Sequence, residues 1–242
     1  MKKFELTEEF KMVMGRKLFR IKALVDFSDV KAGDLGGFVE KEENLDHDGN
    51  AWVGGNACVR GNAWIRGDAW VGENACVEGN ARVGENARVE GSARVRGDAL
   101  VGENARIGGN ALVGENARVR GDACVGENAR VRGFACVEGN ACVGGNARVR
   151  RNAWIRGDAD YTTIKGFGSE FRTTTFFRQK DGTIGVVCGC FCGNIKLFRE
   201  KVKNTHGTTK FAKEYLMIAD LMEMHFDKEE NKNEDTRNEY EQ

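Results

Sequence analysis

The residues best suited to chemistry in this chain are arginines set in a periodic background. Between Ala51 and Gly157 there are fifteen Arg, no Lys and eleven acidic residues. A guanidinium group presents its N–H donors in a fixed fork and can pair with a carboxylate or a phosphate through two parallel hydrogen bonds. This use of one basic residue type indicates an acidic partner or an anionic ligand. The plainer alternative is a set of charge ladders on solvated walls.

A second group with phosphate-like chemistry follows the periodic region. It combines two glycines, several hydroxyls and one cation, namely Gly166, Gly168, Ser169, Arg172, Thr173, Thr174 and Thr175. Glycine-rich loops let backbone N–H groups approach phosphates, but a Walker-type pattern is missing here. Binding of an anion by this segment is therefore a hypothesis that rests on residue type alone.

The cysteines indicate packed thiols rather than a metal site. Eight Cys follow an N-terminus that is charged from Lys2 onward, unlike a secretory leader, so we expect a reducing cytoplasm and free thiols. Cys188, Cys190 and Cys192 alternate with other residues, which predicts one face of a strand. Zinc sites usually use Cys-x-x-Cys knuckles. We therefore expect neither a metal nor a cofactor.

A six-residue period sets the elements that position these residues. Alanine recurs at every sixth residue from Ala51 to Ala159, nineteen times, and Val or Ile stands two residues after it from Val53 to Ile155, eighteen times. Residues six apart point in different directions on a helix but suit short strands that alternate inward and outward. The Ala and Val rows should point inward, and the variable residue between them should point outward.

Three such strands make one triangular coil of eighteen residues, so the repeat gives about six coils. We expect the Asn/Asp position at the corners, where these residues tolerate left-handed backbone and can form amide ladders. The outward residues then fall on three faces. The first carries Trp52, Trp70, Arg88, Arg106, Cys124 and Cys142, the second Cys58, Cys76, Arg94, Leu112, Arg130 and Arg148, and the third Trp64, Arg82, Leu100, Arg118, Cys136 and Trp154.

One stripe of arginines runs along the second face and its following corner. It contains Arg60, Arg94, Arg96, Arg130, Arg132, Arg148, Arg150 and Arg151. Phe134 stands beside the stripe, where the repeat has Asn or Asp. Exposed aromatics next to arginines are frequent binding hot spots. The residues predicted to bind a ligand or partner are Arg94, Arg96, Arg130, Arg132, Phe134, Arg148 and Arg150, with Ser169, Arg172, Thr173, Thr174 and Thr175.

Tryptophan, leucine and cysteine on the walls indicate an interface between subunits. A prism that stays monomeric in water has little reason to expose them. We therefore expect a homo-oligomer. A ligand platform built on the tryptophans is the alternative.

The two ends differ from the repeat and divide the chain into a cap at 1–49, the repeat at 50–157, an α+β domain at 158–226 and a charged tail at 227–242. The cap should contain two strands around Gly15-Arg16. In the C-terminal domain we expect a hairpin at Asp181-Gly182, then one helix capped by Asn194 and ended by Gly207, then a second helix that starts at Thr208 or Thr209.

The repeat unit "VGENAR" resembles the hexapeptide repeat of left-handed parallel β-helix proteins. That resemblance implies left-handed winding, whereas the crossover rule for parallel strands favours the right hand. It also implies a trimer, because related β-helix proteins often trimerise through such walls. The segments "VKAGDLGGFVEKEENL" and "RTTTFF", with the "GNA" units and "CGCF", are similar to hexapeptide-repeat proteins of bacteriophages and prophages. This second resemblance covers nearly the whole chain. It implies a phage origin and a bacterial cytoplasm, and it supplies no catalytic residues.

Three classes of function follow. Many left-handed β-helix proteins are acyltransferases with a catalytic His, but the histidines here, His47, His206 and His225, all lie outside the coils. The favoured class is a non-catalytic binding protein, a rigid scaffold that sequesters a host protein or an anionic nucleotide-like ligand, with counter-defence as one purpose. A virion or tail component is the third. Nucleic acid is less favoured, because fifteen Arg against eleven acids is a modest excess. No membrane segment is expected.

Overall fold

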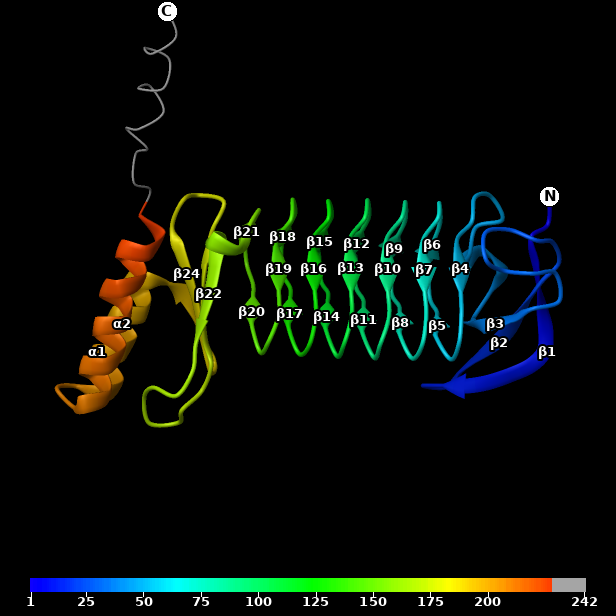
Figure 1. Ribbon diagram of the computed structural model, residues 1–242. Coiled ribbons are helices and arrows are strands. Elements are labelled where there is room, and N and C mark those ends of the chain that lie inside the picture. Colours follow the sequence, from blue (N-terminus) through cyan, green and yellow to red (C-terminus); the bar gives the residue numbers. More distant parts are fainter. Residues whose placement is uncertain (228–242) are drawn as a thin grey trace, which may run out of the picture.

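The computed structural model describes residues 1–227, so the tail predicted at 227–242 lies, apart from Asp227, outside the described residues. A prism of stacked coils forms the middle of the molecule (Figure 1). A β-hairpin cap closes one end, and an antiparallel sheet with two helices closes the other. Within residues 1–227, no helix is both long and apolar enough to cross a membrane.

The coils are built from eighteen two-residue strands in three parallel stacks. The first stack contains β4 (Trp52–Val53), β7 (Trp70–Val71), β10 (Arg88–Val89), β13 (Arg106–Ile107), β16 (Cys124–Val125) and β19 (Cys142–Val143). The second contains β5 (Cys58–Val59), β8 (Cys76–Val77), β11 (Arg94–Val95), β14 (Leu112–Val113), β17 (Arg130–Val131) and β20 (Arg148–Val149). The third contains β6 (Trp64–Ile65), β9 (Arg82–Val83), β12 (Leu100–Val101), β15 (Arg118–Val119), β18 (Cys136–Val137) and β21 (Trp154–Ile155).

The register confirms the predicted eighteen-residue coil. Arg88 pairs with Arg106, and Leu112 pairs with Arg130, in parallel ladders. The alanines from Ala51 and the aliphatics from Val53 are buried along the whole axis, so the inward rows are also as predicted. The fold is thus a mainly β parallel solenoid. Its handedness and its oligomeric state stay predictions.

The corners differ from the prediction in one detail. The left-handed backbone falls on the residue before the Asn/Asp, for example Gly97 with φ 71°. A Cβ on Gly97 would lie 2.9 Å from the backbone nitrogen of Glu115 in the next corner, so close stacking favours glycine there. The predicted amide ladders are confirmed, as in the bond of 2.8 Å from the Asn80 side-chain amide to Asp98.

The N-terminal cap continues the second stack. It contains β1 (Phe4–Val13), β2 (Arg16–Ala23), β3 (Leu35–Val39) and the 3₁₀ turn η1 (Glu42–Asn44). The hairpin turns at Met14-Gly15, and β3 pairs in parallel with β5. Trp52, predicted to lie on an exposed wall, is buried, because the ring of Phe27 packs edge-on against it at 5.4 Å between centroids.

The C-terminal region is an antiparallel sheet between the last coil and two helices. It contains η2 (Asp158–Asp160), β22 (Tyr161–Ile164), β23 (Thr174–Arg178), β24 (Ile184–Cys188), β25 (Phe191–Asn194), α1 (Ile195–His206) and α2 (Lys210–Phe226). Strand alternation sends Phe177 and Val187 into the coil core and sends Phe176 and Val186 toward the helices. The sheet therefore packs on one face against the core of the coils and on the other face against the two helices.

Local signals predicted this region well, with one error. Asn194 and Thr209 cap the two helices and Gly207 ends the first, as expected. The prediction that Cys188, Cys190 and Cys192 share one strand face is wrong. The chain reverses after β24, so that Cys188 pairs with Phe191 across a hairpin. All eight cysteine thiols are free.

Candidate functional site

A cationic cleft lies where the second face of the solenoid meets the loop at 165–173. We call it the Arg172 cleft. It encloses about 410 Å³ and is lined by Asn128, Arg130, Asn146, Arg148, Lys165, Glu170, Phe171, Arg172, Thr173 and Gly189. It brings together Arg130 and Arg148 of the predicted stripe with Arg172 and Thr173 of the predicted loop. Residues far apart in the sequence thus form one concave surface.

The charge of this cleft is strongly one-sided. Arg130 and Arg148 stand on neighbouring rungs as paired residues of β17 and β20, and Lys165 and Arg172 face them from the loop. The only acid in the lining is Glu170, and it already pairs with Arg172 at 3.2 Å. Four cations against one paired carboxylate favour an anionic ligand.

Several contacts fix the position of Arg148. Its backbone N–H donates to the Thr175 hydroxyl at 3.0 Å, and its guanidinium donates to the carbonyl of Gly189 at 3.2 Å. These bonds hold the guanidinium at the wall of the cleft. An oriented cation loses less conformational freedom when it binds a ligand.

Helix α2 positions the loop that carries the other cations. Gly168 lies so close to Tyr215 that a Cβ would clash with the phenol oxygen, and its N–H donates to Glu214 at 3.1 Å. The Tyr215 hydroxyl donates to the carbonyl of Phe167 at 3.4 Å. Burial, with Cys188 nearby, raises the pKa of Tyr215 to about 12, so this donor keeps its proton.

Phe171 is a functional candidate that the sequence reasoning missed. Its φ of 49° puts a bulky residue in the left-handed region, which such residues rarely adopt, and its side chain is 65% exposed. Strained, exposed residues gather at binding sites, and an observed outlier of this kind motivates a functional hypothesis. The only signal in the sequence was an aromatic residue next to Arg172 in a glycine-containing loop.

The remaining predicted site residues fall elsewhere. Thr174 and Thr175 are buried in β23, where one hydroxyl donates to the Cys188 sulfur and the other accepts from the Arg148 N–H, so both serve the fold. Neither residue lines the Arg172 cleft. Ser169, Arg94 and Arg96 line neither this cleft nor the one described next.

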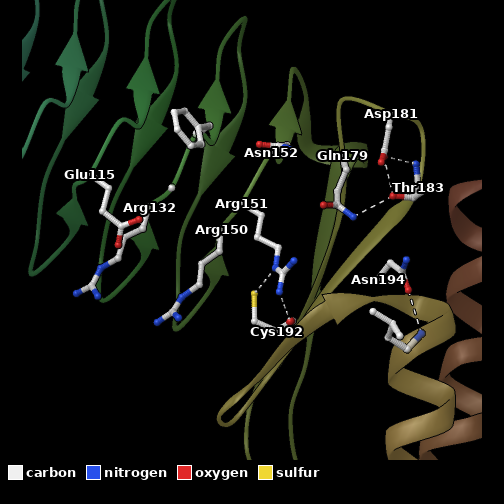
Figure 2. Close-up of a pocket in the computed structure, with 13 residues that line it drawn as sticks. Glu115, Arg132, Arg150, Arg151, Asn152, Gln179, Asp181, Thr183, Cys192 and Asn194 are labelled. Atoms are coloured by element: carbon white, nitrogen blue, oxygen red, sulfur yellow. Dashed lines mark hydrogen bonds between the residues drawn. The ribbon is translucent and has the colours of Figure 1, made fainter.

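A second cleft holds the other part of the stripe, between the last corners and the C-terminal sheet. It encloses about 700 Å³ and includes Arg132, Phe134 and Arg150 of the predicted residues. Figure 2 shows the side chains of Arg132 and Arg150 side by side, with Glu115 next to Arg132. The Nε atoms of both arginines are buried without a hydrogen-bond partner among residues 1–227. Burial, together with Arg96 and Arg150, lowers the pKa of Arg132.

His47 lies in the N-terminal cap, where its ring contacts three other residues. Both ring nitrogens of His47 are occupied: Nε2 lies 2.8 Å from Glu42, and Nδ1 accepts the N–H of Lys3 at 3.1 Å. Its ring also stacks on Phe4. Residues 1–227 contain no group of three or more His, Cys, Asp or Glu side chains that could hold a metal ion.

Comparison of the chain with models of known protein families gave no match, and comparison with curated proteins gave none either.

Proposed function

We propose that this chain is a non-catalytic binding protein that holds an anionic, nucleotide-like ligand in the Arg172 cleft. The observation that carries the proposal is the convergence of four cations with one already paired carboxylate. Phosphate oxygens would accept from the guanidinium groups of Arg130 and Arg172, and a planar base would pack against the exposed ring of Phe171.

The wider setting of this function rests on the resemblance to phage and prophage hexapeptide-repeat proteins. We propose a left-handed solenoid, a phage origin and a place in the cytoplasm of the bacterial host. There the protein would sequester a nucleotide signal and so counter a host defence. The repeat unit and the two end segments support this setting.

Titration calorimetry with nucleoside mono- and diphosphates, cyclic dinucleotides and inorganic phosphate tests the proposed ligand class. Arg172→Ala and Arg130→Ala should each weaken the tightest nucleotide by about tenfold or more, because a charge-assisted hydrogen bond contributes about 1.5–3 kcal/mol. Arg94→Ala is the matched control, since Arg94 occupies the same face but lies outside the cleft. The proposal fails if no nucleotide binds, or if both cleft variants bind like the wild type.

We also propose that the protein is a trimer that uses walls of the solenoid as its interface. Partly exposed Trp70 and Leu100 support this, because such side chains are costly to leave in water. Light scattering at micromolar concentration should give about three times the chain mass of 26.7 kDa. A stable particle of 26.7 kDa would overturn the trimer.

A further inference from the structure

Phe134 interrupts a column of hydrogen-bonded corner side chains and, within residues 1–227, makes no internal contact that replaces the lost hydrogen bonds. In its corner column, the Asn62 amide donates to Asn80 at 3.2 Å, and Asn80 donates to Asp98 at 2.8 Å. A phenyl ring cannot continue this ladder between Asn116 and Asn152. The ring is 68% exposed, so it gives up the ladder and gains little burial in return. The stability of the fold therefore does not explain Phe134, whereas a role in binding would.

The surface on both sides of Phe134 is hollow. One side is the cleft of about 700 Å³ in Figure 2, and the other is a cleft of about 590 Å³. The second cleft is lined by Asn116, Arg118, Arg120, Phe134, Cys136, Asn152, Ala153, Trp154 and Lys180. Both clefts contain Phe134 and Asn152, so together they form one groove with the phenyl ring as a ridge. We call it the Phe134 groove.

A ridge between two hollows suits an extended chain segment better than an enclosed small molecule. An apolar side chain of a partner could pack on the exposed ring while its neighbours descend into the hollows. Trp154, whose indole N–H donates to Glu138, stands in one hollow, and three arginines stand in the other. Aromatic residues and arginine are the types that dominate binding energy at protein interfaces.

The excess of positive charge in the groove favours an acidic partner. Arg118, Arg132, Arg150 and Lys180 form no ion pair within residues 1–227. The acids in the lining are Glu115 and Asp181, and the Asp181 carboxylate already accepts from the N–H and hydroxyl of Thr183. Carboxylates of a partner would pair with the guanidinium and ammonium groups of these unpaired cations.

We propose that the Phe134 groove is a docking site for an acidic loop of a partner protein, with an apolar side chain seated on Phe134. This site is separate from the Arg172 cleft, because the two linings have no residue in common. Its occupancy therefore does not depend on the proposed nucleotide ligand.

Phe134→Asn is the central test, because it restores the residue that the repeat has at this corner and should fold at least as well as the wild type. Short random peptides are displayed and selected on the immobilised full-length protein. The enriched peptides should carry Asp or Glu beside an aromatic or aliphatic residue. A synthetic copy should bind at least about tenfold more weakly to Phe134→Asn and to Arg132→Gln, and equally well to Arg172→Ala.

Three outcomes would overturn the proposal. Selection could enrich no peptide, or only basic or neutral ones. The enriched peptides could bind Phe134→Asn as tightly as the wild type. A single-stranded RNA could bind with dependence on Phe134 while no peptide does, which would assign the groove to nucleic acid. Equal binding by Arg172→Ala separates this site from the nucleotide site, so either proposal can fail alone.

Discussion

The two ends of the solenoid differ in the kind of backbone group that is left without a partner in the next coil. In each rung the backbone N–H groups of the outward-facing residues donate to carbonyls of the following coil, as from Trp52 to Ala69 and from Arg88 to Ala105, both at 2.9 Å. The first coil is therefore left with free carbonyls, and the last coil is left with free N–H groups. Parallel stacking gives the prism a polarity that an antiparallel sheet would not have.

The chain closes each end with the matching kind of side chain. At the first coil, the Lys3 ammonium donates to Ala51 O at 2.9 Å, and the Asn44 amide donates to Ala63 O at 2.8 Å. At the last coil the side chains are acceptors, which are the Asp158 carboxylate for Cys142, the Tyr161 hydroxyl for Gly144 and the Thr175 hydroxyl for Arg148. Donors close one end and acceptors close the other.

The difference explains why the clefts lie at the acceptor end. There the closing groups belong to a folded sheet and its loops, which stand beside the last coils as a second wall. Between the coils alone, the hollow around Leu100 encloses only about 290 Å³ and mixes arginines with Glu85 and Glu103. Similar arginines thus form a solvated wall in the middle and a concave cationic site at the end.

The largest expected effect comes from the core that both ends enclose. Val101→Asp places a charge in a side-chain position that is 2% exposed, where no partner can neutralise it, and should prevent folding. The neighbouring Leu100 is 38% exposed, so Leu100→Asp should fold with nearly wild-type stability. Circular dichroism melts of both variants test this. A wild-type melt for Val101→Asp would contradict the inward assignment.

Asn44→Asp tests the donor end directly. Asn44 is fully buried, and its amide donates to the carbonyls of Gly61 and Ala63 while its oxygen accepts the N–H of Lys41. Asp has the same shape but places a carboxylate against two carbonyl oxygens. We expect a loss of roughly 3–5 kcal/mol in the free energy of unfolding. Asn44→Ala, which brings no repulsion, should lose about 2–3 kcal/mol. Urea denaturation that ranks them in reverse would contradict donor closure.

Thr175→Val is the corresponding test at the acceptor end. Valine keeps the shape but removes the oxygen that accepts the Arg148 N–H, so we expect a loss of about 1–3 kcal/mol. Thr175→Ser keeps the hydroxyl and is the control for this loss. Arg148 lies in the Arg172 cleft, so nucleotide affinity should fall in the valine variant and stay close to wild type in the serine variant. Equal stability of the two variants would mean that the hydroxyl is not needed for closure.

Alkaline pH should change the contributions of the two ends to the free energy of unfolding in opposite directions. A free tyrosine ionises near pH 10, but burial holds Tyr215 neutral until about pH 12. Its contribution is therefore complete below pH 10 and is lost as pH rises from 10 toward 12. Burial lowers the pKa of Lys3 below 10.5, so that end gains stability as pH approaches 10.5. In urea titrations, the free energy of unfolding of the wild type relative to that of Tyr215→Phe should be constant below pH 10 and should fall as pH rises from 10 toward 12.

The predictions that succeeded from sequence concern positions that repeat. The inward rows and the coil register follow from a period sampled eighteen times, and helix caps such as Asn194 follow from local chemistry. One error is local, because the turn between β24 and β25 separates Cys188 from Cys192. The other errors concern contacts between distant segments. Burial of Trp52 requires Phe27 of the cap, and burial of Thr175 requires an unpaired N–H on the last rung. The strained backbone of Phe171 has no signature in residue type, so its role depended on the folded loop.

The smallest expected effect concerns Phe134, which replaces the Asn or Asp of the repeat near the acceptor end, and it distinguishes a role in closing the solenoid from a role in binding. If Phe134 serves closure, Phe134→Asn should destabilise the protein like the other closing residues. If it serves binding, the variant should be more stable by about 0.5–1 kcal/mol, because an asparagine can bond to Asn116 and Asn152 and an exposed phenyl ring is removed from water. The exposure of the ring and the absence of an internal hydrogen bond favour the second outcome. A gain in the urea midpoint at unchanged slope would show that this end has given up stability for a surface, whereas a loss would place Phe134 among the closing residues.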